Sequence, residues 1–236
     1  MWVRIAFFGF WVLLLSVVTV FSSYKNHLRP VEKISVSIEA QYPPMISSDS
    51  VNKLLTLAQH DSLSPQKSAI NLRELEAKLE YNNLIKKAEA FLTIDDILHV
   101  NVRPRIPVLR ILGDGGYYLD HEGSMIPFSP FFEADVPEFC GVLNEENHAD
   151  AAALAVELGK DVFMRSHLGC MYSQSDGIQI EVPQHSYVIK IRTIDQLKQK
   201  FDNYKAFYVY GTDNDLLNKY KEVVLDNTNQ IIGTKI

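Results

Sequence analysis

Charge is almost missing from the start of the sequence, where Arg4 is the only charged side chain among the first 24 residues. The uncharged run from Ile5 to Tyr24 has the length of a membrane-spanning helix, which needs about 20 predominantly apolar residues. The formal net charge of the chain is −6, so the acidic balance falls on the residues that follow this run. A broad nucleic-acid surface needs clustered lysine and arginine, and this composition argues against one.

Cysteine is also scarce, because Cys140 and Cys170 are the only two. No CxxC pair and no cysteine–histidine spacing indicates a metal site. The two thiols could pair in an oxidising compartment, or each could be buried as a small hydrophobic side chain. The sequence leaves both interpretations open.

Motifs for catalysis and cofactor binding are missing as well. The glycine-rich segment 113–123 lacks the third glycine of GxGxxG, because Tyr118 stands there, and a hairpin connection is the better interpretation. No HExxH or GxSxG motif occurs. Asp120, His121 and Glu122 are consecutive in a turn, so their side chains diverge where metal ligands would converge. We therefore predict no catalytic residue, no cofactor, no metal site and no enzymatic activity.

The N-terminal apolar run has two interpretations. A retained membrane anchor is favoured because the run is longer than the 7–15 apolar residues, roughly, of a signal peptide. Phe21-Ser22-Ser23 is also a poor cleavage site. Either interpretation places the rest of the chain outside the cytoplasm, and a cleaved, soluble periplasmic protein stays an alternative.

Residues 25–103 are predicted to form a β-α-α-β-β module. Residues 31–38 alternate as a half-buried strand, and two amphipathic helices follow, capped by one of Ser47 to Asp49 and by Asn71. Residues 85–102 alternate on both sides of Asp95-Asp96 and indicate a hairpin. A three-stranded sheet with both helices on one face buries these apolar positions.

Residues 104–236 are predicted to form a mainly antiparallel β domain with flanking helices, which makes the fold class α+β. Turn residues separate hairpins over 117–128 and 170–183, a strand over 186–191 and a closing strand–turn–strand segment over 219–235. The longest helix of this region is expected within residues 144–167. A further helix is expected from Thr193, as its cap, to Gly211.

Two prolines and two arginines stand between the two predicted regions, at Arg103, Pro104, Arg105 and Pro107. Proline has no N–H for a strand ladder, so these positions indicate a stiff joint between two modules. The arginines, with Arg110, are interpreted as salt-bridged surface groups in an acidic domain, and a partner site is the alternative.

The ordered set of segments resembles the FtsQ/DivIB cell-division family over nearly the whole chain. The resemblance rests on Leu84–Ala88, Leu98–Val102, Arg105–Arg110, the segment with Tyr117, Tyr118, Asp120, Gly123 and Pro127, and the closing helix and strands with Phe201, Lys205–Tyr208 and Asn218–Tyr220. The chain departs from the family where Leu84 and Leu217 replace a frequent tryptophan and Asn227 a frequent tyrosine.

This resemblance implies a cytoplasmic tip and transmembrane anchor over residues 1–24, a POTRA domain over 25–103 and a β domain over 104–236. It implies a non-enzymatic divisome scaffold in the inner membrane at the division septum, single-pass, with its C-terminal domain in the periplasm. Such a scaffold recruits FtsB- and FtsL-type single-pass coiled-coil proteins and links the septal ring to septal peptidoglycan synthesis. An extracytoplasmic envelope enzyme and a POTRA-type chaperone module are the alternative functions.

The closing hairpin 221–235 is predicted to bind the partner. A strand at the end of a chain is often a sheet edge, whose unpaired N–H and C=O groups can accept another strand. The expected contact residues are Tyr220, Val223, Leu225, Ile231 and Thr234. The alternative is that the apolar members of this set fill the core of the β domain.

Overall fold

The computed structural model describes residues 2–27, 29–39, 45–58, 66–113, 115–129, 132–226 and 230–236. The chain divides into two compact units, Met1–Pro104 and Arg105–Ile236. Each unit has a hydrophobic core of its own.

The first unit begins with α1, Trp2–His27, which contains the apolar window Phe7–Asn26. This window holds 20 residues and none of it is buried against protein. At about 1.5 Å per residue it spans about 30 Å, the thickness of the hydrocarbon core of a bilayer. In the part of the chain that the structure describes, this one helix has the length and composition to cross a membrane, and it fits a single-pass anchor.

A three-stranded sheet follows in the described part of the first unit, in the order β1-β3-β2. It contains β1 (Lys33–Ile38), β2 (Ile85–Leu92) and β3 (Ile97–Pro104). The β2–β3 pair is the antiparallel hairpin predicted around Asp95-Asp96, and β1 runs parallel to β3.

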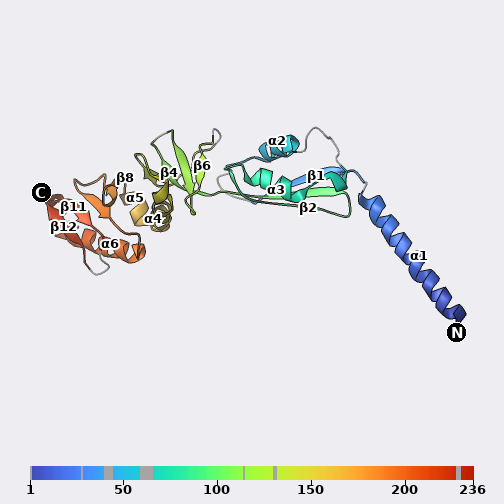
Figure 1. Ribbon diagram of the computed structural model, residues 1–236. Helices are drawn as coiled ribbons and strands as arrows, with labels where there is room; N and C mark the ends of the chain where they lie inside the picture. The colour runs from blue at the N-terminus through green and yellow to red at the C-terminus, as the bar shows by residue number, and fades with distance from the viewer. Residues whose placement is uncertain are drawn as a thin grey trace. The chain divides into compact units, whose positions relative to one another are not determined.

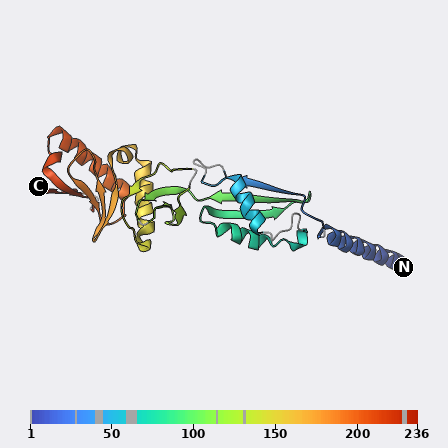
Figure 2. The same ribbon diagram turned by 90° about the horizontal axis from the view of Figure 1, so that it is seen from above.

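The helices α2 (Ser48–Ala58) and α3 (Leu72–Glu80) lie on one face of this sheet, as predicted (Figures 1 and 2). A short helix η1, Lys67–Ala69, precedes α3. Ser47 Oγ accepts a hydrogen bond from Ser50 N, and the Asn71 side chain accepts one from Glu74 N, so both expected caps are present. The core combines Val51 and Leu55 of α2 with Leu75 and Leu79 of α3 and the inward side chains of the sheet.

The described residues of the second unit form a nine-stranded sheet in the order β12-β11-β10-β9-β8-β7-β4-β5-β6. Its first strands are β4 (Pro107–Ile111), β5 (Tyr117–Asp120), β6 (Met125–Pro127) and β7 (Glu138–Phe139). The others are β8 (Met171–Gln174), β9 (Gly177–Glu181), β10 (Val188–Ile191), β11 (Tyr220–Val224) and β12 (Ile232–Lys235). Neighbouring strands are antiparallel except for the pairs β4–β7, β7–β8 and β10–β11.

Among the described residues of this unit, three helices pack on the sheet: α4 (His148–Lys160), α5 (Val162–His167) and α6 (Leu197–Asp213). The short 3-10 helices η2 (Glu145–Asn147) and η3 (Leu217–Lys219) lie next to them in the chain. One core joins Leu154, Met164 and Phe201 of these helices to inward side chains of the strands. The chain is thus a mixed α+β protein, as the sequence predicted.

Two predictions about these helices are wrong. The helix α6 begins at Leu197 and not after Thr193, because Gln196 adopts a left-handed conformation with φ 54°. At 17 residues α6 is also longer than α4, which has 13 and was expected to belong to the longest helix of the region. The residues 144–167 are divided between η2, α4 and α5, and Asp161 separates the last two by capping α5 through Met164 N.

The two cysteines form a disulfide bond, which decides between the two interpretations left open by the sequence. Cys140 follows β7 and Cys170 precedes β8, and their Cα atoms are 5.8 Å apart. The bond therefore fastens the two-residue strand β7 to its parallel neighbour, in a stretch that the sequence predicted to be irregular.

Candidate partner-binding edge

The strand β12 forms one edge of the larger sheet. Within the described residues it pairs with β11 alone, in antiparallel register from Tyr220 with Lys235 to Val224 with Ile232. The register shifts between Tyr220 and Glu222, so the extra residue belongs to β11 and β12 keeps a regular course. The chain therefore presents a regular strand edge at its C-terminal hairpin.

The hydrogen bonds next to β12 show which of its backbone groups point away from the sheet. Ile236 N donates to Lys219 O over 3.1 Å, so this N–H points to the β11 side. Successive N–H groups of a strand point to alternate sides, which places those of Thr234 and Ile232 toward β11. Those of Gly233 and Lys235 consequently point to the open side, where another strand could bind them.

The predicted contact residues differ in where their side chains lie. Val223 and Leu225 are fully buried in the core of the β domain, and Ile231 is half-buried against the same core. Thr234 is exposed on β12. Three of the apolar residues thus have the core placement that was the alternative interpretation.

Tyr220 is half-buried and lies over the backbone of β12. A Cβ atom placed on Gly233 would come within 2.5 Å of its ring, so only glycine fits beneath the tyrosine. On its other side the ring meets Phe207 of α6, edge to face, with centroids 5.5 Å apart. Tyr220 therefore connects the edge strand to the helix layer.

Sequence reasoning missed Ile232 and Ile236, which are 46% and 83% exposed. The adjacent pair Ile231-Ile232 held the signal for the first of these. Side chains of consecutive strand residues point to opposite faces, so a strand that buries one isoleucine must turn the other away from the same core.

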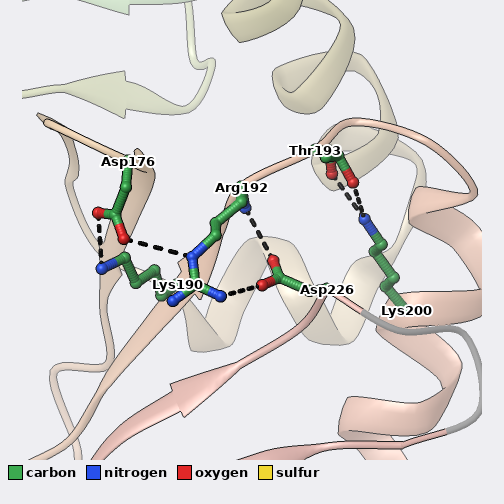
Figure 3. Close-up of polar contacts among 6 residues, drawn as sticks. All are labelled: Asp176, Lys190, Arg192, Thr193, Lys200 and Asp226. Atoms are coloured by element: carbon green, nitrogen blue, oxygen red, sulfur yellow. Dashed lines mark hydrogen bonds and ion pairs between the residues drawn. The ribbon is translucent and has the colours of Figure 1, made fainter.

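Ion pairs fix the other end of this hairpin (Figure 3). Asp226 lies two residues beyond Val224, the last residue of β11, and accepts a hydrogen bond from Arg192 N over 3.1 Å. Its second carboxylate oxygen pairs with the Arg192 guanidinium. Asp176, in the β8–β9 turn, lies 2.7 Å from Lys190 Nζ and 3.3 Å from Arg192 Nε. The predicted turn residues 227–229, Asn227 among them, lie outside the described residues.

The charges of this network reinforce one another. Hydrogen bonds from Lys190 and Arg192 hold the pKa of the Asp176 carboxyl below its ordinary value. Asp176 and Asp226 raise the pKa of Arg192 in turn. Asp176 and Arg192 therefore keep their charge at neutral pH, and their ion pair ties the β8–β9 turn to the residue that follows β10.

Lys200 of α6 is buried beside this network and explains why Thr193 is not a helix cap (Figure 3). Its ammonium donates to Thr193 O over 2.6 Å and to Thr193 Oγ1 over 2.8 Å. Burial lowers the pKa of Lys200, and the nearby Asp226 opposes this shift. The threonine side chain thus binds a lysine ammonium where helix N–H groups were expected.

The predicted joint residues are ion-paired or buried within their own units. Arg103 pairs with Glu39, and Pro104 is the buried last residue of β3. Arg105 Nη1 lies 2.6 Å from Asp120 Oδ2, and the Asp120 side chain is fully buried. Pro107 is the buried first residue of β4. The prolines thus end one strand and begin the next, and Arg110 is paired with Glu133 and Glu138.

A hollow of about 1020 Å³ lies between α4 and α6. Its lining contains no serine, threonine or cysteine. Lys205 Nζ lies 2.7 Å from Asp161 and 2.8 Å from Asp202, which raises the pKa of Lys205 and lowers that of Asp161. The lysine is therefore held as an ammonium and Asp161 as a carboxylate, so neither is available as a neutral nucleophile or acid.

No group of three histidine, cysteine, aspartate or glutamate side chains is placed to hold a metal ion in the part of the chain that the structure covers. Asp120, of the cluster Asp120 to Glu122, instead binds its own turn through Glu122 N and Ser124 N, over 2.9 and 2.8 Å. The hairpin expected around these residues is present as β5–β6.

Comparison with known proteins assigns both units. A model of the POTRA-like domain matches residues 29–103, and a model described as FtsQ/DivIB, C-terminal related, matches residues 106–234. No curated protein matches the chain. The second match covers more than half of the 236 residues and includes the hairpin β11–β12. The chain therefore belongs to the FtsQ/DivIB family, whose domains imply a scaffold role in cell division and are typically non-enzymatic.

Proposed function

We propose that this protein is a divisome scaffold that binds FtsB- and FtsL-type single-pass proteins and so connects the septal ring to septal peptidoglycan synthesis. Three features support the proposal: the two family matches, the apolar helix α1 and the open edge of the larger sheet. The observation that carries it is the edge position of β12.

Binding proceeds by strand addition to β12. The outward N–H and C=O groups of Gly233 and Lys235 would bind the backbone of the partner, which makes much of the affinity independent of side chains. Thr234 and Ile232 share one face of β12, since they are two residues apart, and both are exposed. These two side chains, rather than the buried Val223 and Leu225, would then select the partner sequence.

The other predicted contact residues position this edge. Tyr220 holds Gly233 from one face, Ile231 packs against the core, and Asp226 is bound to Arg192 where the hairpin leaves β11. A strand fixed in this way loses little conformational entropy when a partner binds, and such preorganisation raises affinity.

The proposed location is the inner membrane at the division septum, with both folded units in the periplasm. The Cys140–Cys170 disulfide supports an oxidising compartment for the second unit, because such bonds are rare in the cytosol. Residues 1–24 would then provide a short cytoplasmic tip and the anchor, 25–103 the POTRA domain and 104–236 the β domain.

We also propose that Arg103, Pro104, Arg105 and Pro107 form a stiff joint between the two domains. Only Arg105 and Ile106 lie between the end of β3 and the start of β4. Because proline fixes its own φ angle, few backbone dihedrals remain to change the angle between the domains.

Strand addition is tested with the full chain in detergent and the periplasmic segment of an FtsB-type protein from the same cell, by calorimetric titration. Lys235→Pro removes an outward N–H and leaves the ladder to β11 intact, and Lys235→Ala removes the same side chain while keeping the N–H. The expected result is a loss of affinity of at least tenfold for Lys235→Pro and little change for Lys235→Ala.

Equal binding by both variants would exclude strand addition at β12 and would leave a scaffold with another partner site. Absence of binding by the parent chain, also with an FtsL-type segment present, would contradict the proposed partners themselves. Circular dichroism of each variant shows whether the fold is kept.

A further inference from the structure

The turn between β2 and β3, residues Thr93 to Asp96, presents an aliphatic side chain to solvent. Ile94 is 90% exposed, whereas Leu98, at the start of the following strand, is fully buried. A single exposed isoleucine is ordinary on a protein surface. Its place in the chain therefore decides whether it has a role.

A short series of contacts ties this turn to the end of the apolar helix. Arg29 N donates to Asn26 O over 3.3 Å, and Asn26 is the last residue of the apolar window of α1. The Arg29 guanidinium lies 3.5 Å from Asp96 Oδ2. Ile94 precedes Asp96 by two residues, which is at most about 7 Å of chain. The exposed isoleucine thus lies close to the point where α1 ends.

The strand register supports the same placement. Lys33, at the start of β1, pairs with Ile97, at the start of β3, and the two strands are parallel. The chain that leaves α1 therefore enters the sheet at the end where the β2–β3 turn lies. The opposite end of the sheet is marked by the pair Ile85 and Pro104, with Tyr81 just before β2.

The turn is held firmly in this position. Lys67, which is nearly buried, lies 2.5 Å from Asp96 Oδ1 and donates to Thr93 O over 3.2 Å. Asp96 O accepts a hydrogen bond from Glu32 N over 2.9 Å. The hydrogen bond from Lys67 also lowers the pKa of the Asp96 carboxyl, so the ion pair persists at neutral pH. Ile94 is consequently carried by a fixed turn.

We propose that Ile94 inserts into the headgroup layer of the membrane that α1 crosses, so that the β2–β3 turn is a lipid-docking surface of the POTRA-like domain. The inference rests on α1 being a retained membrane anchor. The headgroup layer adds about 5–7 Å to each side of the hydrocarbon core. The contacts from Asn26 through Arg29 to Asp96 join the turn to the end of α1 that would enter this layer. An aliphatic side chain gains free energy there by leaving water.

The charges beside the turn agree with a lipid partner. Lys25, Arg29 and Lys33 are exposed, and cations near a membrane surface are attracted to lipid phosphates. Glu32 and Asp95 are exposed acids in the same segment, so the cations exceed them only slightly. Insertion of the apolar side chain therefore supplies the contact, and the lysines and arginine set its depth.

Three variants of the full chain, each with one added cysteine, test this inference in vesicles of phosphatidylcholine and phosphatidylglycerol. Ile94→Cys, Tyr81→Cys and Tyr24→Cys each carry an environment-sensitive fluorophore, since the native cysteines are bonded to each other. Tyr81 is also 90% exposed but lies at the opposite end of the sheet, which makes it a matched control. Tyr24, in α1, reports on the anchor. Quenching by spin-labelled lipid is the measurement.

The expected result is quenching at positions 94 and 24 and none at 81. Quenching at 24 with equal, low quenching at 94 and 81 would overturn the docking surface and leave the anchor and the divisome proposal in place. Absence of quenching at 24 would show that α1 is not inserted, and the inference would fail with it.

A label-free measurement guards against an effect of the fluorophore. Hydrogen exchange at residues 93–96 is expected to be slower in vesicles than in detergent, with Ile94→Ser removing at least half of the difference and Tyr81→Ser leaving it unchanged. If the two serine variants behave alike, Ile94 has no part in membrane contact.

Discussion

The two edges of the larger sheet differ in what they offer a neighbouring strand. At β6, Asp120 N donates to Ser124 O, so by alternation the N positions of Met125 and Pro127 point away from the sheet. Proline has no N–H, which leaves Met125 as the one outward donor of this three-residue strand. At β12 both outward positions, Gly233 and Lys235, keep their donors. Proline is a common means of closing an edge, and of these two strands only β6 contains one.

The two halves of the sheet that carry these edges are joined through β7. This strand has two residues and lies between β4 of one half and β8 of the other. The Cys140–Cys170 bond adds a covalent connection at the same place. The sheet therefore has a closed half that ends at β6 and an open half that ends at β12. The short strand β7 joins the two halves, and the disulfide bond strengthens this junction.

Removing the disulfide bond at the β7 junction should have the largest effect on stability. Replacing both cysteines by alanine removes a bridge between residues 30 positions apart, which is worth about 3.5 kcal/mol in the chain-entropy model. We expect the free energy of unfolding of the β domain to fall by about this amount, measured by native-state hydrogen exchange of β4 and β10. The reduced parent chain is the control and should match the double variant. An unchanged free energy in both would show that β7 holds the halves together without the bond.

A larger side chain at Gly233, on the open edge, should have the next largest effect on stability. Gly233→Val places a side chain where the Tyr220 ring lies, and overpacking of this kind costs about 1–3 kcal/mol. We expect faster hydrogen exchange in β12 and weaker partner binding. The double variant with Tyr220→Ala makes room for the valine and should recover part of the binding. Equal loss in the single and double variants would contradict the role given to Tyr220.

Lowering the pH should reduce the stability of the open half of the sheet, and His167 should cause this loss. This buried side chain of α5 bonds through Nε2 to Tyr204 OH over 2.7 Å and stacks on Phe163, with Tyr208 and His185 also against its ring. Burial, and to a lesser degree His185, holds the pKa of His167 below its ordinary value. Burial also raises the pKa of Tyr187, which bonds to Tyr204, to about 12, so this tyrosine stays protonated throughout.

The lowered pKa of His167 sets the direction in which stability changes with pH. The unfolded chain takes up a proton near pH 6.5, where the folded chain does not, so stability is complete above this pH and falls as the pH decreases toward the pKa of the folded state. Urea unfolding of the full chain between pH 7.5 and 5.5 should show this loss, and His167→Asn should reduce its slope. A slope that is the same in the variant would assign the acid effect to other groups.

Altering the closed edge should have almost no effect on binding. Met125→Pro removes the last outward donor of β6 and leaves its ladder to β5 intact. If β12 is the partner site, calorimetric affinity for the FtsB-type segment should change by less than about twofold, in contrast to Lys235→Pro. A tenfold loss would move the partner site toward β6 and reverse the comparison between the edges.

Local patterns predicted the first unit well, because its elements follow from alternation and caps. Asn71 caps its helix, and the alternating residues around Asp95 form the hairpin. The second unit contains features that depend on distant contacts. A strand as short as β7 has no detectable period and depends on β4, β8 and the disulfide. The start of α6 depends on Lys200, whose ammonium occupies Thr193.

The candidate site was predicted as a hairpin but not in its details. The strands β11 and β12 follow from their apolar pattern, whereas the edge position of β12 depends on the order of the whole sheet. The sequence could not tell whether Val223 faces a partner or the core, because either position favours an apolar side chain. The contact of Tyr220 with Gly233 links residues whose pairing depends on a bulge, which the sequence does not encode locally.

The single disulfide also bears on how the protein is made. Cys140 and Cys170 are the only cysteines in the 236 residues, and they form one intramolecular bridge. Closing the bond removes two electrons from the two thiols, so the folded β domain depends on an oxidant that accepts them.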